Sequence, residues 1–387
     1  MIEVKLKDIA INITDGKHGD CANEEHSGFY FVSCKDVHDG AIHYDNARQI
    51  TEKDFIDTHK RTMLEPNDIL ITNSGTIGRM ALVKDIPQTY KTTFQKSVAI
   101  IKPNQEIVRP SYLYYSLINC VSQFINKSNG SAQKNLLLGT MREFKIKIED
   151  NFDKQDKIDY ILSSYDDLIE NNKNQIHLLE EAAQRLYKEW FVDLRFPGYE
   201  DVELVNGVPE GWKITPINMV TKLKAGGDKP KNFSEKMTNE NKIPVFANGI
   251  TKKGLMGFTD KAVISNPSVT ISARGTVGIV FLRTEPYVPI VRLISVTPIE
   301  DKVDIFYLYL YLVNQNFRST GAAQQQITVP LLKSKNIVCP SDDIRKSFND
   351  VITPIFNKIE ILEKHINKLT EARDRLLPKL MNGEIEV

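Results

Sequence analysis

The sequence predicts an α+β protein made of two copies of one unit, each a globular domain followed by a long helix. The first observation is a heptad-spaced stripe of apolar residues over residues 158–190, which returns in the same register over residues 348–380. The second is a set of short segments ahead of each helix that recur in the same order. The offset between matching segments falls steadily from 200 to 190 residues along the chain, which indicates one duplicated unit with small deletions in the second copy.

Three pairs of segments carry the repeat ahead of the helices. A Gly-Thr-Ile-Gly tetrad returns as Gly-Thr-Val-Gly, a Tyr-Leu-Tyr tripeptide returns unchanged, and Gly-Ser-Ala-Gln returns as Gly-Ala-Ala-Gln. Chance similarity would scatter the offsets, so the ordered series supports duplication. The matched ranges are 74–78 with 274–278, 112–114 with 307–309, and 130–133 with 321–324.

Each globular domain is predicted to contain a β-sheet and shorter helices. Runs rich in β-branched and aromatic residues predict strands, and the Gly-Thr tetrads between them predict tight turns whose glycines have positive φ. Apolar residues at helical spacing predict helices over 112–124 and 305–317, and we expect their tyrosines in the core rather than stacked on bases. The predicted strands are 29–33, 68–72, 97–101 and 268–272.

The two apolar stripes most simply bury each other, because steps of three and four residues keep them on one side of each helix. Ser164 and Pro354 occupy matching positions and carry helix-start signals, so each copy is expected to break into a short helix and a long one there. Asn172 takes the stripe position of Leu362, where it either fixes the register as a buried polar residue or lies exposed. The residues expected to pair the helices are Leu162, Ile169, Ile176, Leu179, Leu186, Ile359, Leu362, Ile366, Leu369 and Leu376.

The composition is that of a globular protein, with 41% hydrophobic and 26% charged residues. No apolar run approaches the roughly 18 residues that span a membrane, and the N-terminus lacks a signal-peptide pattern. The four cysteines are scattered and form no disulfide framework, so we expect a cytoplasmic protein.

The net charge is zero, but the charge is unevenly distributed. Residues 211–340 hold 17 Lys and Arg against 8 Asp and Glu, whereas residues 1–150 hold 19 of each kind. A basic second domain suits phosphate binding, although basic domains are also common among proteins that bind no nucleic acid.

Catalytic motifs are missing from the sequence. It has no G-x-x-x-x-G-K-[ST] phosphate-binding loop and no triad that spacing can support. The pattern His18-x2-Cys21-x12-Cys34-x3-His38 resembles zinc-finger spacing, but the ligand order is unusual and the second copy has neither Cys nor His there. We therefore expect no metal site and no catalytic residue.

Together these segments resemble the specificity subunit of type I restriction–modification enzymes. The duplicated plan, the Gly-Thr turns, the Gly-x-Ala-Gln segments, the linker 207–212 (Gly-Val-Pro-Glu-Gly-Trp) and the ending 376–385 carry the resemblance, which covers essentially the whole chain. The first copy departs from the pattern, because it begins without Pro-Glu-Gly-Trp and keeps only Gln155 from the usual lead into its helix.

The resemblance implies a non-catalytic DNA reader. Two target recognition domains would each read one half of a bipartite, asymmetric site in double-stranded DNA. They would comprise residues 1–150 and residues 194–341, and the second range includes the linker. Residues 151–193 and 342–387 would be helical spacers. They would pair antiparallel as a coiled coil with pseudo-two-fold symmetry, set the gap between half-sites and dock two modification subunits.

The resemblance also implies partners and places the cofactors on them. Modification (methyltransferase) subunits would carry S-adenosylmethionine, restriction subunits would use ATP and magnesium, and this chain would hold no cofactor. Two other functions stay open from the residues themselves. One is a scaffold or adaptor whose globular domains bind protein, and the other is a degenerate regulator whose domains fold but read no DNA.

Polar residues of the repeated loops are the candidates for DNA contact. Glutamine amides can pair with adenine edges, and lysine can meet guanine or phosphate, whereas a polar loop that caps the next element is the alternative. The basic loop residues of the second domain are expected to contact phosphates. The candidates are Ser74, Thr76, Gln133, Lys134, Lys229, Lys231, Lys252, Lys253, Arg274, Thr276, Gln324, Gln325 and Gln326.

Overall fold

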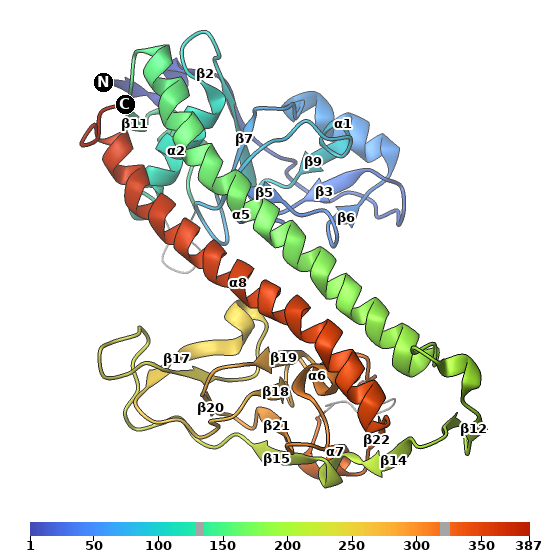
Figure 1. Ribbon diagram of the computed structural model, residues 1–387. Coiled ribbons are helices and arrows are strands. Elements are labelled where there is room, and N and C mark those ends of the chain that lie inside the picture. The colour runs from blue at the N-terminus through green and yellow to red at the C-terminus, as the bar shows by residue number, and fades with distance from the viewer. Residues whose placement is uncertain (129–134, 318–325) are drawn as a thin grey trace. The chain divides into compact units, whose positions relative to one another are not determined.

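The computed structural model describes residues 1–128, 135–317 and 326–387, which form two compact units (Figure 1). Unit 1 comprises residues 1–171 and 365–387, and unit 2 comprises residues 172–364. Both long helices, α5 (Phe152–Tyr187) and α8 (Asp342–Met381), contribute to both units. The domain limits drawn from the sequence remain predictions.

The central sheet has the same plan in both units. Unit 1 holds a four-stranded antiparallel sheet in the order β2-β10-β7-β8, and unit 2 holds β15-β21-β18-β19. Each predicted strand overlaps an observed one, and the matching strand orders confirm the duplication. The strands of these sheets are β2 (Ala10–Asp15), β7 (Ile69–Thr72), β8 (Met80–Leu82), β10 (Val98–Pro103), β15 (Thr221–Ala225), β18 (Ser268–Ile271), β19 (Val280–Arg283) and β21 (Ile294–Pro298).

Smaller sheets surround each central sheet and repeat in part. A first strand pairs with the strand before the long helix in both units, as β1-β11 and β14-β22, and each unit has a three-stranded sheet, β6-β3-β9 or β17-β16-β20. Two short hairpins, β4-β5 and β12-β13, complete the strands of the described residues. Their bounds are β1 (Ile2–Lys5), β3 (Tyr30–Val32), β4 (Val37–His38), β5 (Ala41–Ile42), β6 (Arg48–Gln49), β9 (Thr92–Phe94), β11 (Lys145–Ile148), β12 (Leu204–Val205), β13 (Val208–Pro209), β14 (Lys213–Pro216), β16 (Ile243–Phe246), β17 (Leu255–Thr259), β20 (Val288–Pro289) and β22 (Asn336–Cys339).

The short helices pack their tyrosines into the core, as predicted. Tyr112 and Tyr307 occupy equivalent positions in α2 and α6 and are at most 3% exposed. Their hydroxyls bond to the backbone near the last strand of each domain, where Tyr112 accepts from the Glu149 N–H and Tyr307 donates to the Val338 carbonyl. The short helices are α1 (Glu52–Thr62), α2 (Pro110–Asn119), α3 (Val121–Asn126), α4 (Leu138–Arg142), α6 (Ile305–Val313) and α7 (Val329–Lys333).

Both long helices run unbroken, so the expected break near Ser164 and Pro354 is wrong. The Ser164 hydroxyl donates to the Tyr160 carbonyl inside α5 instead of capping a new helix. Pro354 lies inside α8, where a proline costs about 3 kcal/mol. The apolar neighbours Ile352 and Phe356 are buried on either side of it, and burying such side chains stabilises a fold by roughly 1.5–3 kcal/mol each. Tertiary packing therefore outweighs the local stop signal.

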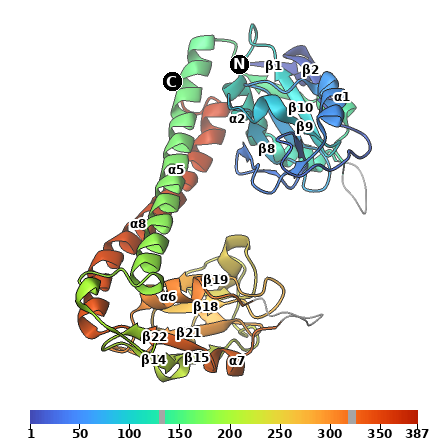
Figure 2. The same cartoon turned by 90° about the vertical axis from the view of Figure 1, so that its right-hand side faces the viewer.

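The two long helices pass close to each other (Figures 1 and 2), and their apolar stripes share a core within each unit. In unit 1 the start of α5 shares a core with the end of α8, through Leu162 and Leu380. In unit 2 the end of α5 shares a core with the start of α8, through Tyr187 and Phe348. The reversed order makes the pairing antiparallel in each unit.

The residues predicted to pair the helices fall into two classes. Leu162, Ile169, Ile359 and Leu362 are buried, and the other six are half-buried. Asn172 is only 9% exposed, so the buried alternative holds at that stripe position.

A junction ties α5 to α2 in unit 1. Gln155, fully buried near the start of α5, accepts from the Arg109 N–H at 2.8 Å and donates to the Glu149 carbonyl at 2.7 Å. The Arg109 side chain, at the N-cap of α2, donates two hydrogen bonds to Asp156, at 2.7 and 3.1 Å. Gln155 thus bonds to the backbone at Arg109 and Glu149, and the next residue, Asp156, adds an ion pair with the Arg109 side chain.

Unit 2 builds the same junction with the charges reversed. The N-cap of α6 is Asp304, and its carboxylate accepts from Arg345 of α8 at 3.1 and 3.2 Å. Asp304 matches Arg109 at the repeat offset of 195, and Arg345 matches Gln155 at the offset of 190. The acid lies on the long helix in unit 1 and on the short helix in unit 2.

Among the described residues, the structure contains no helix long and apolar enough to cross a membrane.

Candidate DNA-recognition surface

The strand register defines the same end of the central sheet in both units. In unit 1, Val98 begins β10 opposite Thr72, the last residue of β7, and the next residue pairs with Asp15 at the end of β2. In unit 2, Ile294 begins β21 opposite the last residues of β15 and β18. We call this end the loop edge of each unit, because the loops that follow β2 and β7, or β15 and β18, leave the sheet there.

The Gly-Thr tetrads form the hairpin turns at the loop edge, as predicted. They connect β7 to β8 and β18 to β19, and each is closed by a 2.9 Å backbone hydrogen bond, from Gly78 to Thr72 or from Gly278 to Ser272. All four glycines have positive φ, which glycine adopts at no steric cost. The values are 76° at Gly75, 89° at Gly78, 68° at Gly275 and 84° at Gly278.

Candidate side chains on these turns differ between the units. Thr76 is exposed and Ser74 half-buried in unit 1, whereas unit 2 presents an exposed Arg274 and a half-buried Thr276. The Arg274 guanidinium donates to the Gln326 side chain at 3.3 Å. The structure therefore brings together two of the candidates, which lie 52 residues apart in the sequence.

The candidates Gln133, Lys134, Gln324 and Gln325 lie outside the described residues. The residues that follow them return to the turns in both units. The Leu136 N–H donates to the Asn73 carbonyl at 2.8 Å, and the Ile327 N–H donates to the Ala273 carbonyl at 3.1 Å. The chain thus meets the loop edge directly after both predicted glutamine segments.

The predicted phosphate-binding lysines have different surroundings. Lys229, Lys231 and Lys252 are exposed, and the Lys229 ammonium lies 3.5 Å from the centre of the Phe233 ring. Lys253 instead forms a 2.5 Å ion pair with Glu363 of α8, so a phosphate would have to compete with that carboxylate.

A buried cation supports the loop that carries Lys252 and Lys253, and the sequence reasoning missed it. Arg283 is 5% exposed, donates to the Lys253 carbonyl at 2.6 Å and to the Thr270 hydroxyl at 3.1 Å, and lies 3.6 Å from the centre of the Phe246 ring. Burial lowers the pKa of Arg283 to about 10. Both lysines have positive φ (50° and 54°), a strained conformation that such an anchor helps to maintain.

Two further cations at the loop edge were also missed. Lys96 and Arg292 are exposed and precede β10 and β21 by the same two residues. In unit 2 the backbone shortly before Arg292 packs closely against the loop that follows β15. A Cβ on Gly226 in that loop would lie 2.7 Å from the Pro289 carbonyl carbon. Only the strand register places these cations beside the Gly-Thr turns.

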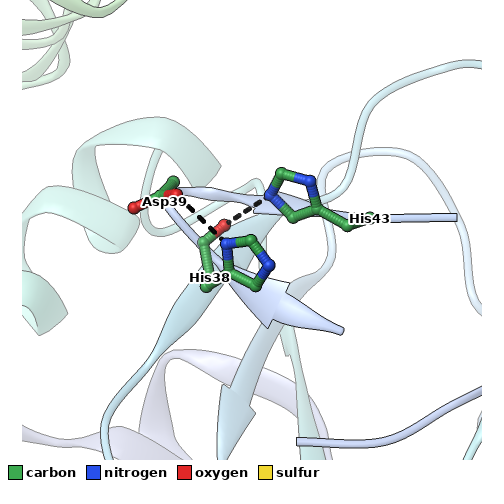
Figure 3. Close-up of side chains that lie close together, drawn as sticks. All are labelled: His38, Asp39 and His43. Atoms are coloured by element: carbon green, nitrogen blue, oxygen red, sulfur yellow. Dashed lines mark hydrogen bonds and ion pairs between the residues drawn. The ribbon is translucent and has the colours of Figure 1, made fainter. Parts of the chain in front are cut away.

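The zinc-finger-like set does not converge in space. Within the part of the chain that the structure describes, the one group of three or more metal-ligating side chains is His38, Asp39 and His43, which contains only one residue of that set (Figure 3). The His18 ring instead contacts Asp15 at 3.1 Å.

Each of the two copies of the α+β unit exposes hydrogen-bond donors and cations on loops at the same end of its sheet, so the chain is a duplicated-fold protein with two related polar loop surfaces. The chain belongs to the family described as type I restriction modification DNA specificity domain, whose sequence model matches residues 2–181 and 209–371. The two matched ranges fall on the two copies of the repeat.

Individual relatives agree with this assignment along most of the chain. The MjaIX specificity subunit of a type I restriction enzyme from Methanocaldococcus jannaschii is 28% identical over 88% of this chain and 82% of its own length. The HindI specificity subunit from Haemophilus influenzae is 25% identical over 74% of this chain and 80% of its own. The crystal structure of the type I S subunit from M. genitalium has the same fold, with a TM-score of 0.60, 16% identity and coverage of 98% and 95% of the two chains.

Proposed function

We propose that this chain is the sequence-reading subunit of a type I restriction–modification complex, without catalytic activity of its own. Each unit would read one half of a bipartite site in double-stranded DNA through its loop edge. The family membership and the duplicated loop edge support this function, and the comparisons lend no support to a protein-binding scaffold.

One observation carries the proposal: equivalent positions on one backbone framework hold different polar side chains. Ser74 and Asn135 of unit 1 correspond to Arg274 and Gln326 of unit 2. Arginine pairs with guanine through two hydrogen bonds, and asparagine and glutamine pair with adenine. The same framework would therefore read two different half-sites, which makes the complete site asymmetric.

The exposed cations would hold the DNA backbone while the turns read base edges. Lys96, Arg292, Lys229 and Lys231 suit phosphate contacts, which fix register and orientation without specifying sequence. The paired helices would set the gap between half-sites and dock modification subunits. S-adenosylmethionine would bind to these subunits, and ATP and magnesium to restriction subunits.

The first test selects bound sequences from a random duplex library, using the full-length chain together with a type I modification subunit. Arg274→Ala should weaken discrimination at one position of one half-site by about 5- to 150-fold, the equivalent of about 1–3 kcal/mol. Ser74→Ala should alter only the other half-site. The control Lys346→Ala removes an exposed cation from α8 and should leave the selected sequence unchanged. Identical selected sequences for Arg274→Ala and the wild type would remove the reading role of this turn.

The second test separates phosphate contacts from base contacts by salt dependence. Replacing both Lys229 and Lys231 by alanine should reduce the slope of log affinity against log salt by about two, without changing the selected sequence. Lys253→Ala should change the slope less, because its ammonium is paired with Glu363. If Lys253→Ala reduced the slope by as much as each of the other two lysines does, the ion pair with Glu363 would not persist on DNA.

A further inference from the structure

The β4-β5 hairpin of unit 1 carries two histidines and an aspartate close together. His38 ends β4, Asp39 and Gly40 form the two-residue turn with φ of 52° and 79°, and His43 follows β5. His38 pairs with Ala41 across the hairpin, so His43, two residues further on, lies on the same face as a diagonal neighbour.

The side chains of this cluster already contact one another (Figure 3). The two imidazole rings stack with centroids 3.7 Å apart, and His38 Nδ1 lies 3.1 Å from the Asp39 carboxylate. His43 Nε2 lies 3.2 Å from the His38 carbonyl oxygen. One ligand atom from each of the three side chains lies within 4.8 Å of the other two.

We propose that His38, Asp39 and His43 bind a divalent transition-metal ion of the Zn²⁺, Co²⁺ or Ni²⁺ class. Two imidazole nitrogens and a carboxylate oxygen are a donor set that such ions prefer, whereas Mg²⁺ and Ca²⁺ favour oxygen ligands alone. Three protein ligands leave one tetrahedral position for water.

Binding needs the three ligand atoms to come closer together than they are in this structure. Tetrahedral ligands at about 2.0–2.1 Å from zinc lie about 3.4 Å apart, so the ligand atoms must approach by at most about 1.5 Å. In parallel stacked rings the nitrogen lone pairs point in parallel directions and not at one common point. One ring must therefore turn out of the stack before both nitrogens can bind the same ion. His38 is half-buried and His43 is exposed, so the His43 ring is the one with solvent beside it to turn into.

The hairpin backbone offers a fixed platform for this movement. Val37 is fully buried, the His43 N–H donates to the Asp36 carbonyl at 2.8 Å, and Gly40 pairs with Ala81 of β8. A fixed backbone lowers the ordering cost of bringing the three ligands together.

The cluster lies outside the duplicated framework and outside the proposed DNA contacts. No histidine occurs between His177 and His365, so unit 2 has no equivalent cluster. The proposal therefore stands or falls independently of the DNA-reading function.

The test uses the full-length chain, freed of metal with a chelator and titrated with Zn²⁺ in a calorimeter and with Co²⁺ by absorption. We expect one ion per chain and a Co²⁺ spectrum without the thiolate band that cysteine ligands produce. His38→Gln and His43→Gln should each weaken binding by at least about 10-fold. Asp39→Asn should weaken it too while preserving the turn, since asparagine tolerates positive φ. The control His365→Gln removes an exposed histidine of α8 and should bind like the wild type.

The outcome that overturns the proposal is equal Zn²⁺ affinity for the wild type and His43→Gln. A Co²⁺ spectrum with thiolate ligation would equally overturn it, because the ion would then belong to a cysteine. Circular dichroism spectra matching the wild type would show that a variant lost the site and not its fold.

Discussion

The buried Gln155 side chain should contribute more to the stability of unit 1 than any exposed polar residue of α5. Gln155→Leu keeps a side chain of similar size but removes both hydrogen bonds. The Arg109 N–H and the Glu149 carbonyl then lose their partner and face a leucine side chain in place of the fully buried amide of Gln155. Each buried backbone group left unsatisfied costs about 1–3 kcal/mol, so we expect a loss of about 2–5 kcal/mol after the small gain from a more apolar side chain.

Native-state hydrogen exchange measures this loss where it occurs. Opening of unit 1 should become roughly 30- to 5,000-fold more frequent, at 1.36 kcal/mol for each factor of ten. Exchange should accelerate in peptides that cover α2 and β11, and peptides from β18 and β21 of unit 2 serve as an internal reference.

A matched variant isolates the cause. Gln184→Leu makes the same chemical change on an exposed position of α5, where surface substitutions stay within about 0.5 kcal/mol. If Gln155→Leu and Gln184→Leu exchange alike in unit 1, the two hydrogen bonds do not hold the junction and the reasoning fails.

Three other perturbations test different parts of the molecule. Hydrogen bonds from Lys5 and Lys7 lower the pKa of Glu143 to about 2, so its stabilising contribution is complete above the unfolded value of about 4.3 and is lost as the pH falls through about 2. An NMR titration checks that midpoint, and Lys5→Met should raise it. Arg283→Gln should lower the free energy of unfolding of unit 2 by about 1–3 kcal/mol, because the ring contact and the buried hydrogen bond to the Thr270 hydroxyl are lost. Urea unfolding followed by tryptophan fluorescence reports on unit 2, which contains both tryptophans, and an unchanged midpoint would contradict this role. Four residues inserted beside Lys173, with four in α8, add about 6 Å of helix and should lengthen the gap in the methylated site by about two base pairs. Methylome sequencing that finds the old gap with retained activity would end the spacer hypothesis.

Local patterns in the sequence were sufficient for most of the fold. The duplication, the strands of the central sheets, the buried tyrosines and the positive φ of the turn glycines follow from residue types at short spacing, and the structure confirms them. The predicted helix breaks failed, because the signals at Ser164 and Pro354 are local whereas burial of α8 on both sides of the proline is tertiary. Secondary structure near such signals depends on what the helix packs against.

The candidate surface was less accessible to sequence reasoning. Lys96 and Arg292 reach the loop edge only through strand register, and the burial of Arg283 depends on Phe246, which comes from another sheet. His43 had a readable signal, since an Asp-Gly pair between alternating apolar residues indicates a two-residue hairpin. That hairpin places His43 on the same face as His38.

The charge-reversed junctions favour docking of each short helix on the start of the long helix from its own copy of the repeat. A short helix could dock on the wrong long helix, because both copies share spacing and apolar faces. Such an exchange would set Arg109 against Arg345 and Asp304 against Asp156, and like charges this close repel. The same rule would act on evolution by recombination. A recombined globular domain keeps its ion pair when the start of its long helix is exchanged with it. Viable crossovers should therefore fall inside α5 or α8 and seldom at the beginning of either helix.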